Sequence, residues 1–174
     1  RGMEESGGRR IKRSINIDQG TIKFIEPELK ERLEKIKLLS NHFLKKEKEI
    51  EDANSLLGKE KVNHRRLTNI GVFRAYIIEY LKTSDKINNN LTMMVRQLTP
   101  TSMGLPLEVY AFTSSVEWTE YESVQSDIFD HLLATISVFD LKLTQAPSGN
   151  DIKSLGININ KNSKNINEKL SRAD

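Results

Sequence analysis

The clearest hydrophobic pattern in the chain lies between residues 104 and 143. Apolar side chains alternate with polar or aromatic ones over residues 107–112, and this period of two predicts a β-strand. Beyond this strand, apolar side chains recur at steps of three and four residues, which predicts an amphipathic helix over residues 117–138. Its apolar face consists of Trp118, Tyr121, Ile128, Phe129, Leu132 and Ile136. Residues 141–145 predict a short second strand, and a helix with one apolar face packs across the sheet that its two flanking strands join.

The start of this helix is acidic. Thr113, Ser114 and Ser115 can cap the first turn, while Glu117 and Glu120 lie where the helix dipole favours negative charge. We therefore attribute these acids to helix formation rather than to a pair of catalytic carboxylates.

Two shorter alternating runs stand near the start of the chain, at residues 9–17 and 21–25. Asp18, Gln19 and Gly20 separate the two runs and form a turn signal. Together they predict a β-hairpin.

The middle of the chain predicts two helices and a strand. Residues 28–58 carry many Lys and Glu side chains around a weak apolar stripe, so we expect a charged helix that projects from the body of the domain. A second helix is predicted from residue 70. A strand follows over residues 91–98, with Met94 and Leu98 facing the core.

Taken in order, these elements predict an α+β fold of the split β-α-β-β-α-β (ferredoxin-like) type, a sandwich with an inserted charged helical segment and a short N-terminal β region. The predicted parts are residues 1–27 as the end of a β domain and the leading strands of an α/β domain, residues 28–69 as the charged helical insertion and linker, residues 70–149 as the α/β domain, and residues 150–174 as a polar tail. The Asn, Lys and Ser content of the tail predicts disorder.

Composition narrows the class of protein. The 174 residues are 37% hydrophobic with a mean hydropathy of -0.52, and no run approaches the roughly 18 apolar residues of a membrane helix. Because the sequence opens with Arg1 rather than Met, we expect this chain to be a soluble fragment of a longer protein. The sequence upstream of it could contain a membrane part. The absence of cysteine excludes disulfides, thiolate metal sites and cysteine nucleophiles.

No motif predicts catalysis. Ser114 and Ser115 lack a G-x-S-x-G context, and no glycine-rich phosphate loop is present. His131 follows Asp127 and Asp130 on the predicted helix, but no second histidine stands four residues away, so we interpret it as a surface histidine. We expect no enzyme activity, no cofactor and no metal.

Two stretches carry a more specific signal. The chain opens with RGMEESGGRRIKRSINID, and residues 95–149 read VRQLTPTSMGLPLEVYAFTSSVEWTEYESVQSDIFDHLLATISVFDLKLTQAPSG. Together they resemble the cytoplasmic part of the small-conductance mechanosensitive ion channel family, and are most similar to its miniconductance branch. The pieces ESGGRRIKRSI, GLPLEVYAFT and EYESVQSDIFDHLLA carry this resemblance, which covers residues 1–149 and is looser over residues 28–66.

The resemblance implies one subunit of a membrane channel. In that family, membrane helices precede a small β domain and an α/β domain, and the subunits form a ring, commonly a heptamer, around a water-filled vestibule. Membrane tension opens the pore, and solutes leave the cell under hypoosmotic stress. This chain would be the cytoplasmic vestibule domain on the inner side of the membrane, without the pore helices. Its implied partner is a further copy of itself, with no nucleic acid bound.

A ring needs an interface in which one surface patch contacts a different patch. The basic run near the start and the acidic helix are candidate complementary surfaces, although solvation alone would also explain both. The candidate interface residues are Arg9, Arg10, Lys12, Arg13, Glu117, Trp118, Glu120, Tyr121 and Asp127. Trp118 is expected either in the core or at such an interface, because large aromatic side chains anchor both.

A free-standing α+β binding module, for instance one that binds RNA, is the alternative. An RNA-binding sheet presents aromatic side chains within basic surroundings. Tyr110 and Phe112 supply aromatic rings, but the charges near them in the sequence are acidic, which argues against RNA. If several hydrophobic spans were encoded upstream of residue 1, the channel would be favoured over the binding module.

Overall fold

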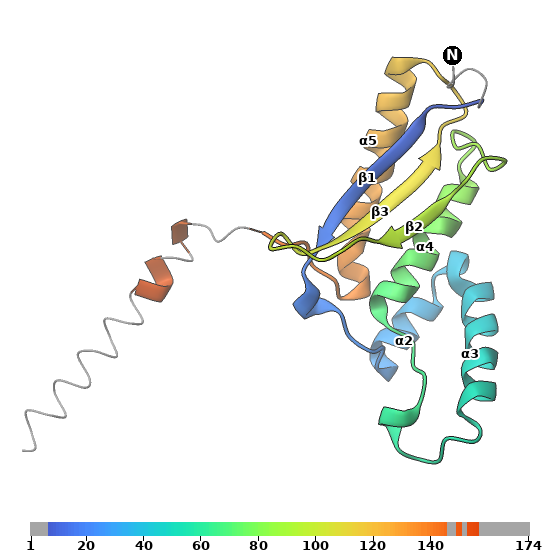
Figure 1. Ribbon diagram of the computed structural model, residues 1–174, viewed down its shortest axis with the longest axis vertical. Helices are drawn as coiled ribbons and strands as arrows, with labels where there is room; N and C mark the ends of the chain where they lie inside the picture. The colour runs from blue at the N-terminus through green and yellow to red at the C-terminus, as the bar shows by residue number, and fades with distance from the viewer. Residues whose placement is uncertain (1–6, 146–148, 151–152, 157–174) are drawn as a thin grey trace, which may run out of the picture. The chain divides into compact units, whose positions relative to one another are not determined.

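The computed structural model describes residues 7–145, 149–150 and 153–156. The chain forms two compact units, residues 1–144 and residues 145–174, and the elements discussed below belong to the first. Helices combine with an antiparallel sheet, which confirms the predicted mixture of helix and strand (Figure 1). The polar tail predicted over residues 150–174 lies largely outside the described residues.

The sheet consists of β1 (Arg10–Ile17), β2 (Met94–Gln97) and β3 (Leu105–Phe112) in the order β1-β3-β2. The central strand β3 is antiparallel to both neighbours. Its alternation is the predicted one, because Leu107, Val109 and Ala111 are 0% exposed and point to the same face. Burying one Leu or Val side chain contributes about 1.5–3 kcal/mol to the stability of the fold.

Two helices, α4 (Asn69–Thr83) and α5 (Trp118–Thr135), lie on this apolar face of the sheet (Figure 1). The helix predicted from residue 70 is confirmed as α4. It begins where the Thr68 hydroxyl accepts a hydrogen bond from the Gly71 N–H at 3.1 Å. Such a cap satisfies one of the amide groups that have no partner within the helix.

The start of α5 differs from the prediction. Its N-cap is Glu117, whose carboxylate accepts hydrogen bonds from the N–H groups of Thr119 and Glu120. The cap expected at residues 113–115 is therefore wrong, because one carboxylate two residues further on satisfies two amides and also matches the helix dipole.

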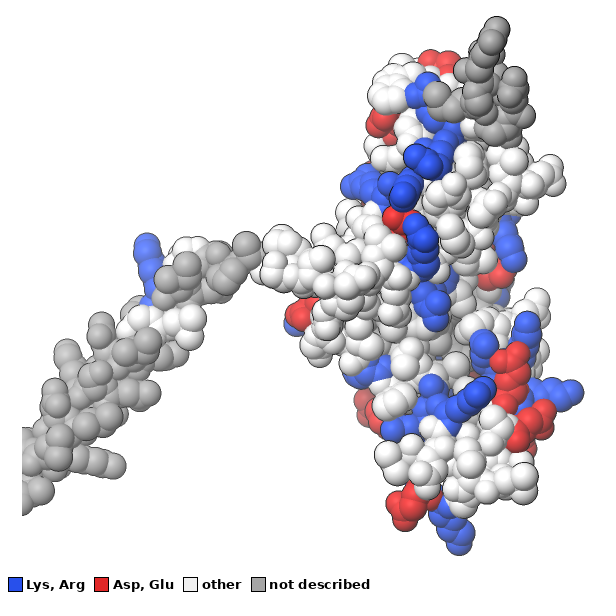
Figure 2. All heavy atoms as spheres, in the orientation of Figure 1, with Lys and Arg blue, Asp and Glu red and all other residues white. Residues whose placement is uncertain are grey.

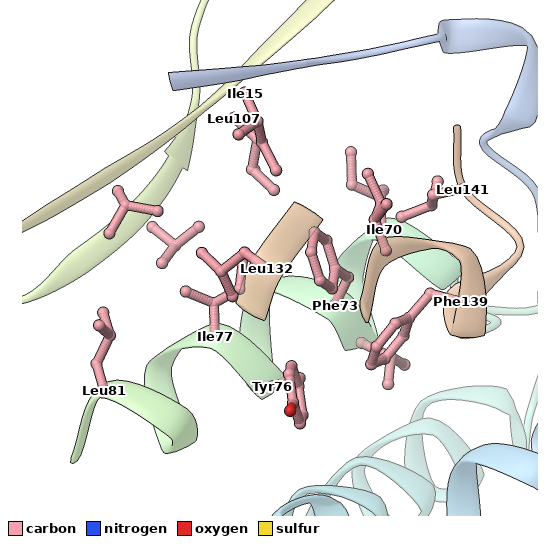
Figure 3. Close-up of a cluster of buried hydrophobic side chains, with 14 of the residues drawn as sticks. Ile15, Ile70, Phe73, Tyr76, Ile77, Leu81, Leu107, Leu132, Phe139 and Leu141 are labelled. Carbon is pink, nitrogen blue, oxygen red and sulfur yellow. The ribbon is translucent and has the colours of Figure 1, made fainter. Parts of the chain in front are cut away.

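The core lies between the sheet and these two helices (Figure 3). Ile15 and Leu107 project from the sheet toward side chains of α4, with Leu132 of α5 beside them. The short helix η4 (Ile136–Phe139) continues α5 and inserts Phe139, whose ring centroid lies 4.9 Å from that of Phe73. The core thus joins the helices to each other as well as to the sheet.

Asp140 ends this segment in the left-handed region, at φ 55°. Its carboxylate accepts hydrogen bonds from Lys23 and from Arg32, each at 2.9 Å. These two bonds hold the pKa of Asp140 below its ordinary value, with the Lys23 bond contributing most.

The β-hairpin predicted from the first two alternating runs is wrong. After β1 the chain passes through η1 (Gln19–Thr21) and continues to the start of α4, where Phe24 makes a single bridge to Thr68. β1 pairs with β3 instead. The apolar side chains of β1 need an apolar surface beside them, and β3 provides one. The run at residues 21–25 does not, since its Phe24 is 45% exposed.

Asn69 fixes the chain where it reaches α4. Its side chain is 0% exposed, and its Oδ1 accepts hydrogen bonds from the N–H groups of Lys23 at 3.0 Å and Ile70 at 2.9 Å. Its Nδ2 donates to the carbonyl oxygens of Thr21 at 2.9 Å and Phe139 at 3.0 Å. All four hydrogen-bonding positions of this amide are occupied, so one side chain joins three segments of the fold.

The charged helix predicted over residues 28–58 is divided into α2 (Pro27–Glu34), η2 (Lys37–Leu39) and α3 (Ser40–Asn54). A further short helix, η3 (Lys61–Asn63), follows before α4. The apolar side chains that enter the core from this segment are Leu29, Leu33, Leu39 and Phe43. The prediction that it projects freely is therefore wrong for its first half, because the break at η2 folds the weak apolar stripe back onto the core.

The strand predicted over residues 91–98 is shorter, since only β2 pairs with β3. Its register places Val95 opposite Val109, so Val95 faces the core, whereas Met94 and Leu98 were expected there. The sheet alternates with a period of two, and the register therefore decides which set of side chains is buried.

The strand predicted over residues 141–145 is not formed as such. Leu143 makes a single antiparallel bridge to Ile17, and the Thr144 N–H donates to the Asn16 carbonyl oxygen at 2.9 Å. The chain thus runs along the outer edge of β1 for only a short distance.

Candidate functional site

Arg9, Trp118 and Tyr121 lie together at the start of α5, and we call them the Arg9–Trp118 cluster. The guanidinium carbon of Arg9 lies 4.6 Å from the Trp118 ring centroid and 5.5 Å from that of Tyr121. The Tyr121 hydroxyl donates to the Arg10 carbonyl oxygen at 2.7 Å, and burial raises the pKa of Tyr121. Arg9 is thereby brought against two candidate residues that lie more than 100 positions away in the sequence.

Trp118 lies outside the core, since its side chain is 57% exposed. Of the two predicted placements, the core is therefore excluded. The buried residues of α5 are Val124, Ile128, Phe129 and Leu132. Trp118 is the first residue of the helix, one turn and more before this buried stripe begins, so helical spacing alone overestimates its burial.

The remaining candidate interface residues lie on both faces of the sheet. The guanidinium carbon of Arg13 lies 4.3 Å from the Phe129 ring centroid, so both Arg9 and Arg13 contact α5 of their own chain. Glu120 pairs with Lys86 at 3.5 Å, while Asp127 is exposed. The basic run and the acidic helix are thus neighbours within one chain, and their contact with another subunit stays a prediction.

The outer face of the sheet, which we call the outer sheet face, carries a row of basic side chains. The side chains of this face include Arg10, Lys12, Met94, Arg96, Glu108, Tyr110 and Phe112. Figure 2 shows Lys and Arg aligned over the strands on this side. Arg10 stands opposite Phe112 and Lys12 opposite Tyr110, so the surroundings of the two aromatic rings are basic rather than acidic as expected.

Glu108 is the acidic member of the outer sheet face. It is only 4% exposed, and its carboxylate accepts a hydrogen bond from the Arg96 Nε at 2.9 Å. This bond neutralises the buried carboxylate, and it leaves the positive charges of Arg10 and Lys12 to determine the character of the face.

A hollow of about 500 Å³ lies between α3, residues 64–68 and the first turns of α4, and we call it the basic groove. Its cationic side chains are Lys46, Arg65, Arg66 and Arg74, with His42 and His64 beside them. Burial and the nearby Lys46 lower the pKa of His42. The sequence pattern predicted only the charged helical insertion and a linker in this region; the His-Arg-Arg run at residues 64–66, just before the α4 cap, was the available signal for the groove.

His131 contacts two tyrosines of α4. Its Nε2 is hydrogen bonded to the Tyr76 hydroxyl at 2.6 Å, and its ring stacks on that of Tyr80 with centroids 4.0 Å apart. Burial raises the pKa of both tyrosines. Within the described residues, no group of three or more His, Cys, Asp or Glu side chains could hold a metal ion.

Comparison with known families adds no assignment, since no protein-family model matches the sequence. Among the described helices, none combines the length and the apolar character needed to cross a membrane.

Proposed function

We propose that this chain is a cytoplasmic vestibule domain of a mechanosensitive channel that releases solutes under hypoosmotic stress. The observation that carries the proposal is the Arg9–Trp118 cluster. It places an exposed tryptophan, a tyrosine and an arginine side by side, and these residue types dominate the binding energy of protein interfaces. The same residues lie within the two stretches on which the family resemblance rests.

The proposal includes a ferredoxin-like sheet. β1 and β2 are both antiparallel to the strand β3 between them, which is the arrangement of a split β-α-β unit. The bridge between Ile17 and Leu143 adds a short edge contact where the fourth strand of such a fold would lie.

The proposed interface contacts an unlike surface of the next subunit, because a ring is closed by head-to-tail contacts. Val116, which is 39% exposed, adds apolar area next to Trp118. The cluster thereby has an apolar centre with charged residues around it, as interfaces commonly do. Under this proposal the pore helices belong to further sequence of the same protein.

The first test uses the full-length coding sequence. It should encode several hydrophobic spans before residue 1, and the purified protein should be a ring, with a heptamer expected. Trp118→Ala should reduce the fraction of protein in the ring, measured by native mass spectrometry. Leu133→Ala is the matched control, since Leu133 is a 37% exposed apolar residue on the same helix. A coding sequence without hydrophobic spans would refute the channel.

The isolated chain should be monomeric or only weakly associated. Exposed ion pairs contribute at most about 1 kcal/mol each, and a single small aromatic cluster is less than a stable interface requires. Residual association should weaken as salt increases, because charges are screened over about 10 Å at 0.1 M. Sedimentation velocity across a salt series measures this, and a salt-resistant heptamer would place the main adhesive surface within this chain.

The outer sheet face favours a second candidate, a module that binds single-stranded RNA. Tyr110 and Phe112 are partly exposed, and their ring centroids lie 5.7 Å apart. The guanidinium carbon of Arg10 lies 6.0 Å from the Tyr110 ring centroid. Adjacent aromatic rings on a basic sheet are the means by which such modules stack bases.

Fluorescence anisotropy with labelled oligouridine separates the two candidates. If the RNA candidate holds, Phe112→Ala should weaken binding about tenfold or more, since stacking on one ring contributes about 1–3 kcal/mol per base. Trp118→Ala should leave RNA binding unchanged, because it lies outside the sheet face. Absence of saturable binding to the unsubstituted chain would eliminate the RNA candidate.

A further inference from the structure

The segment of the basic groove that carries Arg65 and Arg66 is fixed by hydrogen bonds at two points. The Arg65 N–H donates to the Asn54 Oδ1 at 2.8 Å, and the Asn54 Nδ2 donates back to the Arg65 carbonyl oxygen at 2.9 Å. Two residues further along this segment, the Leu67 carbonyl oxygen accepts a hydrogen bond from the Ile25 N–H at 2.9 Å. The segment that carries the arginines is therefore fixed in place, which lowers the entropy that a ligand would lose on binding.

The charge of the groove is largely uncompensated. Glu49 is the one acidic side chain among the described lining residues; its carboxylate pairs with Lys46 at 3.0 Å and also attracts Arg65. Within the part of the chain that the structure describes, Arg65, Arg66 and Arg74 form no ion pair. Three guanidinium groups around one hollow repel each other, and an anion bound between them would relieve this repulsion.

Side chains rather than backbone amides would contact the anion. The Ile70 N–H is bound by Asn69, and the Gly71 N–H is bound by Thr68, so the first amides of α4 are already occupied. Guanidinium groups bind two oxygens of a phosphate at once, which makes arginine the suitable residue for this role. The positive end of the α4 dipole adds to the same field.

The groove also has an apolar wall. Phe24, Ile50 and Leu67 line it, and the guanidinium carbon of Arg66 lies 3.9 Å from the Phe24 ring centroid. Stacking on this ring orients the Arg66 side chain at the mouth of the groove. A volume of about 500 Å³ suits a small molecule, so the occupant would combine phosphate charge with an organic part.

We propose that the basic groove binds a small phosphate-bearing anion, of the size of a nucleoside diphosphate, through Arg65, Arg66 and Arg74. Two or more negative charges are required to match the three guanidinium groups. The inference does not depend on the proposed function, since it uses a different face of the chain from the Arg9–Trp118 cluster.

Isothermal titration calorimetry on the whole chain tests this binding, with inorganic pyrophosphate and ADP as probes at physiological ionic strength. Arg66→Gln and Arg74→Gln should each raise the Kd about tenfold, as expected for loss of a charge-assisted hydrogen bond. Lys48→Gln is the matched control, because Lys48 is an exposed residue of α3 that does not line the groove but carries the same charge. Both arginines are exposed, so all three variants should remain folded, and only Arg66→Gln, which loses the contact with Phe24, should lower the urea midpoint slightly.

A second arm distinguishes the source of the phosphate. Binding to phosphatidylglycerol vesicles, with no binding to phosphatidylcholine vesicles and the same dependence on Arg66 and Arg74, would assign the groove to a phospholipid headgroup. Binding of ADP or pyrophosphate with that dependence would assign it to a soluble phosphate. Lack of binding to every probe would overturn the proposal, and so would an equal loss of affinity in Lys48→Gln.

Discussion

Replacing Asn69 by alanine should lower the free energy of unfolding by about 4 kcal/mol, because each buried polar group left without a partner costs about 1–3 kcal/mol. The Ile70 N–H and the Phe139 carbonyl oxygen would lose their partner inside the core. The backbone groups of Lys23 and Thr21 are nearer the surface and would regain water. Urea denaturation followed by circular dichroism measures the change.

Asn69→Asp and Asn41→Ala are the companion variants. The aspartate keeps the shape and the acceptor oxygen of Asn69 but loses the two donated hydrogen bonds, so it should destabilise about as much as alanine. Asn41 is exposed on α3, and its replacement by alanine should change stability by less than about 0.5 kcal/mol. Similar effects at Asn69 and Asn41 would show that the junction at α4 contributes little.

Phe139→Ala should lower the free energy of unfolding by about 3–5 kcal/mol, the usual range for removal of a fully buried phenylalanine. Its ring is 0% exposed and packs against both Phe73 and Tyr76, with centroids 4.9 Å and 5.4 Å away. Loss of the ring opens a cavity between α4 and η4 that the neighbouring side chains can fill only in part.

Trp118→Ala is the informative comparison for Phe139. Removing an exposed tryptophan and its cation–π contact should lower the free energy of unfolding by about 1 kcal/mol or less. Removing a tryptophan from the core would lower it several times more. Thermal melts of the two variants, recorded side by side, test this difference. Equal destabilisation would mean that Trp118 is buried after all.

The elements with strong periodicity could be predicted from sequence. Both β3 and α4, as well as the extent of α5, follow from side chains that repeat at the spacing of one face. The pairing of β1 could not, because an alternating strand fits any apolar neighbour, and the adjacent run at residues 21–25 looked as suitable as β3. Local pattern decides the type of an element, while its partner depends on the whole core.

The candidate sites show the same limit. The aromatic and basic residues of the Arg9–Trp118 cluster were identified one by one, but not their mutual contact, since Arg9 lies more than 100 positions from the aromatic residues in the sequence. The basic groove was missed because its cations come from α3, α4 and the segment between them. In the sequence, Lys46 stands among glutamates and Arg74 lies within the apolar run of α4, so no single basic cluster is visible.

The pairing of β1 with β3 has a consequence for how the chain folds. The Thr113 N–H donates to the carbonyl oxygen of Arg9 at 2.9 Å, 104 positions earlier, so the sheet is closed by contacts of high sequence separation. During synthesis at about 5–20 residues per second, β1 would wait roughly 5–20 s for its partner. Contacts of this kind make folding slow, because the loop must close before they contribute. The arginines and lysine of β1 would keep the waiting strand soluble, since charged side chains discourage pairing with other chains.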